Sequence, residues 1–313
     1  MAGTTVDRPI FIVGSGRCGS TLFHQALSYH PQVAFLTEAC ARHPASAWQN
    51  RMIMRLLDAP LVGRYLRRRF PANEHWAFWN WHCRGFSRPC RDLLADDVRP
   101  NEAAHIQAVL AGIPAGRRRR LAIKFTGWPR IGFLAGVFPD AKFIHLLRDG
   151  RAVVNSLLNV DFWQGWVGPE SWGWGKLTGP EEEEWRISGK SFVVLAAIQW
   201  KRHMDAFEIA KTRLTPEQCL ELKYENFARA PVSEMERVLE FCELEADGNF
   251  NAKIAALAVD NRNSKWRDQL TRPQQLLLED SLRDHLRRYQ YELDGEQPTP
   301  LDPPCCPAYG HRA

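Results

Sequence analysis

Short apolar runs separated by segments of helical periodicity dominate the pattern of this chain. Residues 10–13, 121–125 and 142–147 have the length of buried strands, residues 219–224 alternate as a strand does, and residues 34–36 form a shorter strand-like run. Strands separated by helices indicate a parallel sheet with right-handed crossovers, which binds ligands at the carboxyl ends of its strands. We therefore predict the α/β class, with a central parallel sheet flanked by helices.

Helical periodicity is clearest over residues 22–29, 131–137 and 192–211, and in a helix that begins near Thr271 and reaches Tyr289. Residues 52–70 alternate apolar and basic positions. This pattern is typical of an ordinary amphipathic helix, and a weak contact with a membrane surface is the alternative.

Two segments rich in tryptophan interrupt the periodic pattern, near residues 71–92 and 160–187. They could be lids or walls of a ligand pocket, or a second aromatic core under long loops. The 313 residues fit one domain over 1–296 with these two insertions. The proline-rich tail at 297–313 is expected to be poorly ordered.

The charge balance of 41 basic against 36 acidic residues gives a net charge of +5, which is too small to indicate nucleic acid binding. The arginine runs at 67–69 and 117–120 are predicted to be solvated faces, with polyanion contacts as the alternative. The eight cysteines show no paired metal or disulfide spacing, and no apolar stretch is long enough to be a signal peptide or to span a bilayer. We expect a cytoplasmic protein.

A glycine-rich turn follows the first predicted strand and opens directly onto a helix. Its sequence from Gly14 to Thr21 is GSGRCGST, in which Arg17 is the cation. Glycines let backbone N–H groups turn inward, and the helix start adds unpaired N–H groups and the positive end of its dipole, so the turn is suited to phosphate or sulfate. The spacing from Gly14 to Gly19 matches a nucleotide P-loop, but Ser20 stands where the lysine would be, which disfavours an ATPase or GTPase.

A second candidate anion site follows the strand at 142–147. Arg148 ends this strand, and Ser156 lies two helical turns further along. A guanidinium makes a forked, charge-assisted contact with phosphate, and the serine hydroxyl can reach the same side of the helix. An ion pair between Arg148 and Asp149 at a surface turn is the alternative.

Together, these two segments resemble the PAPS-dependent sulfotransferases, in particular the bacterial and tyrosylprotein branch. The resemblance implies that Arg148 and Ser156 bind the 3′-phosphate of the nucleotide. It also implies that the first turn binds the 5′-phosphosulfate through Ser15, Gly16, Arg17, Cys18, Gly19, Ser20 and Thr21. Cys18 beside Arg17 could carry a reactive thiolate, although a small residue that fits the turn explains it as well.

Weaker matches to the same family extend the site. Tyr224, in the segment Tyr-Glu-Asn-Phe, resembles a tyrosine near the nucleotide, and an edge tyrosine of a strand is the alternative. Ser264 and Lys265 correspond to a late basic loop that closes over the nucleotide, although a solvated loop remains possible. The resemblance assigns Lys124 to the sulfuryl group or the bridging oxygen.

The transfer needs a base for the acceptor proton. The resemblance points to Glu38, which follows the strand after the first helix, with His24 and His43 as runners-up. The implied reaction is a metal-independent, in-line transfer of the sulfuryl group from PAPS to the hydroxyl of a sugar, lipid, phenol or other small molecule, with PAP as product. A P-loop kinase and a non-catalytic nucleotide- or glycan-binding module are the alternatives.

Overall fold

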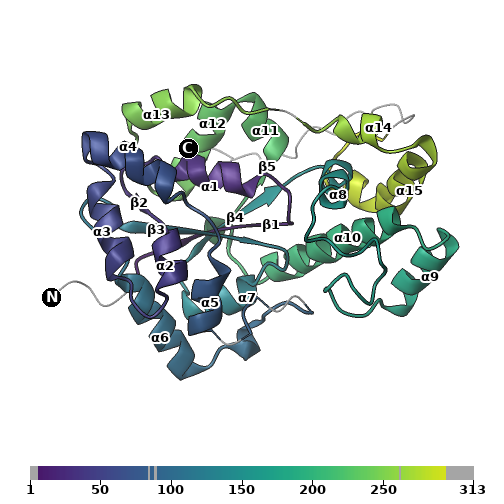
Figure 1. Cartoon of the computed structure of the whole chain (residues 1–313), viewed down its shortest axis with the longest axis horizontal. Helices are drawn as coiled ribbons and strands as arrows, with labels where there is room; N and C mark the ends of the chain where they lie inside the picture. Colours follow the sequence, from purple (N-terminus) through teal and green to yellow (C-terminus); the bar gives the residue numbers. More distant parts are fainter. Residues whose placement is uncertain (1–5, 84, 88–89, 261, 294–313) are drawn as a thin grey trace, which may run out of the picture.

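A five-stranded parallel sheet forms the centre of the molecule (Figure 1). The computed structural model describes residues 6–83, 85–87, 90–260 and 262–293, so the predicted tail at 297–313 lies outside the described residues. The strand order is β2-β3-β1-β4-β5, and every pairing is parallel. The strands are β1 (Ile10–Gly14), β2 (Val33–Ala34), β3 (Arg120–Thr126), β4 (Lys142–Leu147) and β5 (Cys219–Lys223). The predicted α/β class is confirmed.

Alternate residues of β1 face two separate layers of helices. Phe11 and Val13 belong to the larger core, in which the Phe11 ring lies 6.1 Å from Phe125 and 5.6 Å from Phe143, between ring centroids. This core also takes residues from α2 (Glu38–Arg42), α3 (Trp48–Leu56), α4 (Pro60–Arg69), α5 (Trp76–His82), α6 (Pro100–Ala111), α7 (Ile131–Val137), α8 (Gly150–Leu158), α10 (Phe192–Lys211), α14 (Lys265–Gln269) and α15 (Arg272–Arg288).

Ile10 and Ile12 face the opposite layer. This layer contains α1 (Ser20–Ser28), α11 (Tyr224–Arg229), α12 (Pro231–Phe241) and α13 (Gly248–Ala255). The remaining elements are α9 (Gly179–Ile187) and the 3₁₀ turns η1 (Ala95–Asp97) and η2 (Pro216–Gln218). The sheet is therefore covered on both faces, as expected for parallel strands.

Element boundaries differ from the sequence predictions where a turn residue decides them. The helix predicted over 52–70 is two helices, α3 and α4, because Pro60 starts a new helix. The strand expected at 34–36 is the two-residue β2, and the strand expected to include Tyr224 ends at Lys223, so that Tyr224 begins α11. The helix predicted from Thr271 is confirmed as α15, with a capping box between Thr271 and Gln274.

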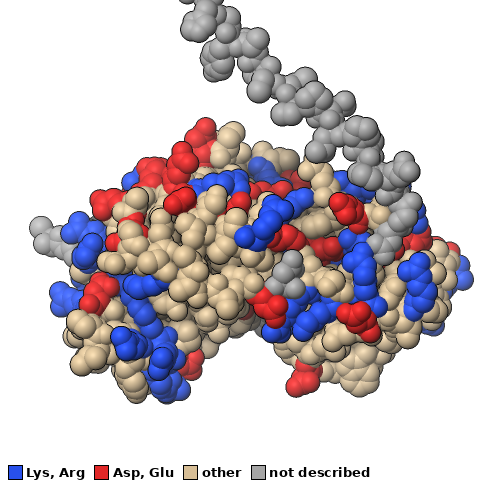
Figure 2. All heavy atoms as spheres, turned by 90° about the horizontal axis from the view of Figure 1, so that it is seen from above, with Lys and Arg blue, Asp and Glu red and all other residues tan. Residues whose placement is uncertain are grey.

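Charged side chains of both signs are interspersed over the face seen in Figure 2, in keeping with the small net charge. Within the described ranges, no helix combines the length and apolar composition needed to cross a membrane.

The arginine run at 117–120 is only partly a solvated face, which corrects the sequence prediction. Arg118 is fully buried, and its guanidinium donates to the carbonyl oxygens of His30 at 3.1 Å and Val33 at 2.7 Å, and to the Asp58 carboxylate at 2.7 Å. The His30 carbonyl also accepts from the backbone N–H of Val33 at 3.1 Å, so Arg118 adds a second donor there and joins this loop to the first residue of β2 and to Asp58. Arg118 is therefore a structural residue.

We expect Arg118→Leu to lower the free energy of unfolding by about 1–3 kcal/mol, because it removes a donor from buried carbonyl oxygens and leaves the half-exposed Asp58 carboxylate with Arg67 alone at 3.8 Å. The exposed neighbour Arg117 provides the control, and Arg117→Leu should stay within about 0.5 kcal/mol of the wild type. Urea denaturation followed by circular dichroism measures both, and equal stability of the two variants would show that Arg118 is not structural.

Candidate active site

The turn between β1 and α1 has the geometry of an anion cradle. Gly19 is the N-cap of α1 with φ 87°, and no side chain caps the helix. Arg17 is also left-handed, with φ 68°. The first N–H groups of α1 therefore stay available to an anion, with the positive end of the helix dipole behind them.

Tyr224 packs directly against this cradle. A Cβ atom added to Gly19 would lie 2.4 Å from two carbons of the Tyr224 ring, so only glycine fits beneath it. The Arg148 guanidinium lies over the same ring, 4.8 Å from its centroid. The structure thus brings together three residues that the sequence analysis selected from distant motifs.

Cys18 faces the apolar core on the α1 side of the sheet and is fully buried. Burial raises the pKa of its thiol above the ordinary value. This burial disfavours the reactive thiolate and agrees with the other interpretation, that Cys18 is a small residue that fits the turn.

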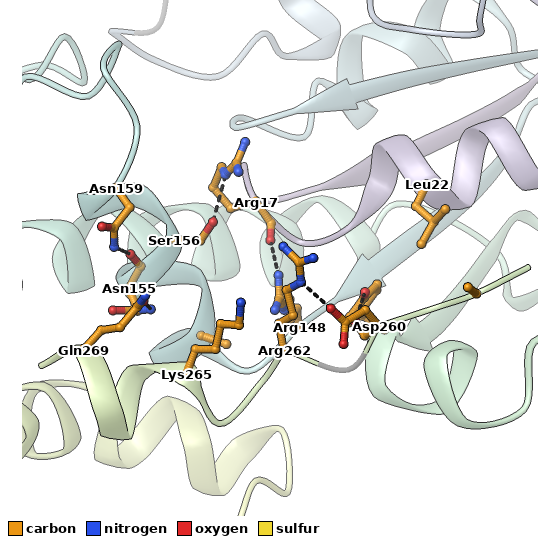
Figure 3. A pocket seen from close by; sticks show the side chains of 13 residues that line it. Arg17, Leu22, Arg148, Asn155, Ser156, Asn159, Asp260, Arg262, Lys265 and Gln269 are labelled. Carbon is orange, nitrogen blue, oxygen red and sulfur yellow. Dashed lines mark hydrogen bonds and ion pairs between the residues drawn. The ribbon is translucent and has the colours of Figure 1, made fainter. Parts of the chain in front are cut away.

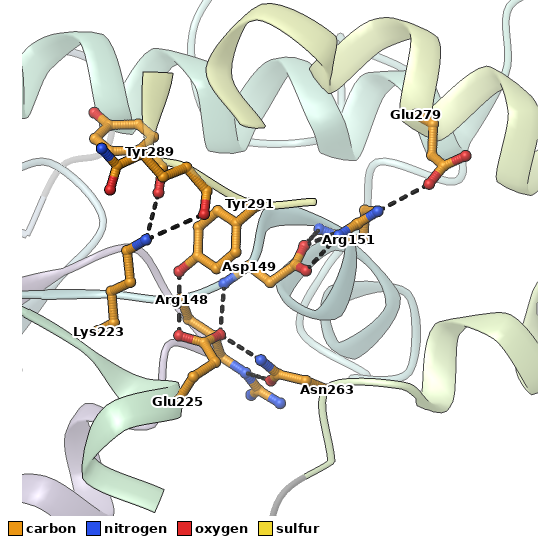
Figure 4. Close-up of polar contacts among 10 residues, drawn as sticks. Arg148, Asp149, Arg151, Lys223, Glu225, Asn263, Glu279, Tyr289 and Tyr291 are labelled. Atoms are coloured by element: carbon orange, nitrogen blue, oxygen red, sulfur yellow. Dashed lines mark hydrogen bonds and ion pairs between the residues drawn. The ribbon is translucent and has the colours of Figure 1, made fainter. Parts of the chain in front are cut away.

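Three segments of the predicted site are joined by side-chain contacts (Figure 3 and Figure 4). Arg17 Nε donates to Ser156 Oγ of α8 at 3.0 Å, and Arg148 Nη1 donates to the carbonyl oxygen of Arg17 at 2.9 Å. Arg148 Nε donates to Asn263 Oδ1 at 2.9 Å. The hydroxyl of Ser156 thus contacts Arg17, and Arg148 connects the cradle to the late loop.

A cavity of about 520 Å³ lies between these segments. Among the described residues, four cations and one carboxylate line it. The carboxylate, Asp260, pairs with Arg262 at 2.6 Å, so the cavity is suited to a polyanion. Its lining residues are Arg17, Leu22, Arg148, Ala152, Asn155, Ser156, Asn159, Tyr224, Ala258, Asp260, Arg262, Lys265 and Gln269. Lys265 lies here as predicted, whereas Ser264 is exposed and is not among the described lining residues. Arg262 also lines this cavity, although the sequence motifs did not predict it as a site residue.

A polar network behind the first cavity holds Arg148 (Figure 4). The Glu225 carboxylate accepts from the backbone N–H of Asp149 at 3.0 Å, from the Tyr291 hydroxyl at 3.1 Å, and from the Asn263 amide. The segment after α15 is thereby fastened to the turn that presents Arg148.

Asp149 pairs with Arg151, not with Arg148. It accepts from the backbone N–H of Arg151 as the N-cap of α8 and from its guanidinium at 2.9 Å, while Arg151 also donates to Glu279 of α15 at 2.8 Å. The Arg148 guanidinium is therefore left facing the cavity.

A second cavity of about 800 Å³ adjoins the first and shares Arg17, Leu22, Arg148 and Ser156 with it. Lys124, at the end of β3, lies on its wall and is almost fully buried. Its Nζ donates to Thr21 Oγ1 in the cradle at 2.7 Å and lies 3.7 Å from Glu74 Oε1. Lys124 therefore stands between the cradle and the second cavity.

Glu74 is a residue that the sequence analysis missed. Its Oε1 accepts from Thr126 Oγ1 at 2.5 Å, and its Oε2 accepts from Trp76 Nε1 at 3.2 Å. It lies in the loop before α5, where no motif or periodicity distinguishes it from the loop carboxylates that face solvent.

None of the three candidate bases from the sequence is among the described residues that line the two cavities. The Glu38 side chain is 43% exposed and lies 3.3 Å from Arg42 Nε and 3.9 Å from His75 Nδ1. His24 is fully buried, and burial lowers its pKa to about 3. His43 is exposed at the end of α2.

The two tryptophan-rich segments serve both of the functions considered for them. Trp79, Trp163 and Trp172 are buried in core clusters. Trp76 and Trp174 line the second cavity, together with the exposed Phe162. The segments thus supply core packing and cavity walls at once.

Comparison with known proteins agrees with this geometry. Residues 9–248 match the pattern described as the sulfotransferase family. The chain is 25% identical over 241 residues to protein-tyrosine sulfotransferase A from Caenorhabditis elegans, an alignment that covers 76% of this chain and 50% of that protein. The chain belongs to the sulfotransferase family and spans about half the length of this curated relative.

Solved structures share the fold. Sulfotransferase STF9 from Mycobacterium avium superposes with a TM-score of 0.58 at 19% identity, covering 93% of this chain and 79% of that chain. The sulfotransferase domain from the curacin biosynthetic pathway gives a TM-score of 0.55 at 15% identity, covering 92% and 99%. At these identities the likeness concerns the fold alone.

The buried histidines predict how stability depends on pH. Burial lowers the pKa of His203, beneath the second cavity, to about 3, so the folded protein binds fewer protons than the unfolded chain as pH falls below about 6.5. We expect this histidine to lower the free energy of unfolding by about 1.4 kcal/mol for each unit that the pH falls between pH 6 and pH 4.

His203→Phe should remove that part of the slope, whereas His43→Phe, at an exposed position, should retain it. Urea denaturation at several pH values measures the slope, and an unchanged slope in His203→Phe would contradict the assignment.

Proposed function

We propose that the protein transfers a sulfuryl group from PAPS to an acceptor hydroxyl and releases PAP. Family membership supports this reaction, and so does a cation-lined cavity that adjoins a second, aromatic-walled one. The observation that carries the proposal is Lys124, whose ammonium contacts Thr21 of the cradle on one side and faces Glu74 of the second cavity on the other.

The residues present fit the nucleotide. Ser15 Oγ is buried without a hydrogen-bond partner in the described part of the chain, and α1 begins without a side-chain cap. We assign the 5′-phosphosulfate to the cradle from Ser15 to Thr21, with Lys265 and Tyr224 on the surrounding wall. We assign the 3′-phosphate to Arg148 and Ser156, in accord with the forked geometry of a guanidinium.

Bound PAPS supplies an activated sulfuryl group. Lys124 and Arg17 supply positive charge where negative charge develops on the bridging oxygen during the transfer. Ser264 remains a catalytic candidate from the sequence alone. For the acceptor proton, Glu38 remains the prediction from the sequence, with His24 and His43 behind it.

We propose a sugar, lipid, phenol or other small molecule as acceptor, because aromatic faces at Trp76, Phe162 and Trp174 suit flat or apolar surfaces. We also propose a cytoplasmic location, because the six cysteines in the described residues are free thiols, four of them buried. Fractionation of the source cells tests the location.

The 3′-phosphate assignment predicts that PAP binds about ten- to a hundredfold more tightly than adenosine 5′-phosphate, the loss expected for a charge-assisted contact. Arg148→Ala should bring the two affinities together, while Arg213→Ala, at an exposed position outside the cavities, should leave the difference intact. Isothermal titration calorimetry measures both ligands, and equal wild-type affinities would contradict the assignment.

Radiolabelled PAPS and γ-labelled ATP, each incubated with the protein and a heat-treated extract of the source cells, separate sulfotransferase from kinase. We expect label transfer from PAPS alone, and equal transfer when EDTA is present. Transfer from ATP would favour the kinase, and PAP binding without any transfer would favour a binding module.

A further inference from the structure

The second cavity contains one acid–base group that neither the sequence motifs nor the family match assigns. Among the described residues that line it, Glu74 is the carboxylate and there is no histidine. A general base must come within hydrogen-bond reach of the proton that it accepts. Among the described lining residues, Glu74 is therefore the one placed to act as a base.

The two oxygens of Glu74 have different surroundings. Oε1 is occupied by the Thr126 hydroxyl at 2.5 Å and lies 3.7 Å from Lys124 Nζ, whereas Oε2 accepts the longer bond from Trp76 Nε1 at 3.2 Å. A carboxylate has about four lone-pair sites. Each oxygen accepts one hydrogen bond and retains a free lone pair, and the bond to Oε2 is the longer and weaker of the two. The side chain is held on both sides, is 17% exposed, and belongs to the cavity wall.

Lys124 lies between Glu74 and the cradle, where we propose that the phosphosulfate binds. Its Nζ lies 2.7 Å from Thr21 Oγ1, at the cradle, and 3.7 Å from Glu74 Oε1, at the second cavity. An acceptor hydroxyl that approaches Lys124 from the second cavity comes close to the Glu74 carboxylate, because the two side chains are adjacent there.

Glu38 lacks the position that Glu74 has on the wall of the second cavity. Its carboxylate contacts Arg42 of its own helix, and it is not among the described residues of either cavity wall. The two carboxylates can therefore be tested against each other.

We propose that Glu74 is the base that accepts the acceptor proton, an inference that rests on the proposed sulfuryl transfer. The acceptor O–H bond breaks and its proton passes to Glu74 Oε2, while the electron pair of that bond forms the new O–S bond. The S–O bond to the nucleotide phosphate breaks, and its electron pair stays on the phosphate oxygen of PAP, where Lys124 balances the charge.

The test compares Glu74→Gln, Glu74→Asp, Glu38→Gln and the exposed-surface control Glu240→Gln in single-turnover transfer from radiolabelled PAPS to the heat-treated extract. Glutamine keeps the shape and the contact with Thr126 but is not basic, so Glu74→Gln should slow transfer by about 10²–10⁴-fold. Glu74→Asp should recover part of the rate, and Glu240→Gln should match the wild type.

Two further readouts separate a base from a structural residue. Calorimetry should give the same PAP affinity for Glu74→Gln and the wild type, because the cradle is unchanged. The decrease of the wild-type rate at low pH should disappear in Glu74→Gln, which has no carboxylate to protonate.

The outcomes are distinct. If Glu74→Gln transfers label as fast as the wild type, Glu74 is not the base, while the proposed function stands. The same conclusion follows if Glu38→Gln loses activity and Glu74→Gln does not. A large loss of PAP affinity in Glu74→Gln would also overturn the assignment, in favour of a structural role. No transfer by the wild type would overturn the proposed function and this assignment with it.

Discussion

The parallel ladders on both sides of β1 fix the relative positions of the charged groups at the site. Gly14 is paired with Thr126 of β3, and Val13 with His145 of β4, so these strands reach their carboxyl ends at one edge of the sheet. The cradle and Arg148 come directly after β1 and β4, and Lys124 lies near the end of β3. A slip in register would move each strand end along its neighbour and reverse which side chains face each helical layer.

The sequence alone predicted the site residues that lie near the carboxyl end of a single strand. Arg148 and the cradle from Ser15 to Thr21 each follow a short apolar run, and hydrophobic patterning makes such runs visible. Lys124 lies inside such a run, and the resemblance assigned its role. Tyr224 was found by resemblance, and its contact with Gly19 explains why an aromatic residue fits there. The strands of the sheet were predicted for the same reason, with errors at their ends, whereas one predicted helix over 52–70 proved to be two.

Residues whose environment depends on distant segments could not be predicted in this way. Arg118 is buried because carbonyls of the loop before β2 converge on it, although it lies in a run that reads as solvated. Glu74 acquires its surroundings from Thr126 and Lys124 of β3, some fifty positions along the chain. Nothing in the residues beside either of them signals these contacts, because they arise only when the chain has folded.

The contact between Gly19 and Tyr224 has a consequence for how the sequence can vary. A side chain at position 19 meets the Tyr224 ring, and the left-handed backbone there disfavours any replacement even when the ring is removed. Shortening Tyr224 would make space but would also remove the aromatic face on which the Arg148 guanidinium rests. Position 19 therefore admits glycine alone, whereas position 224 needs an aromatic ring but not the hydroxyl, whose contact is a 3.3 Å bond to the carbonyl oxygen of Asp260.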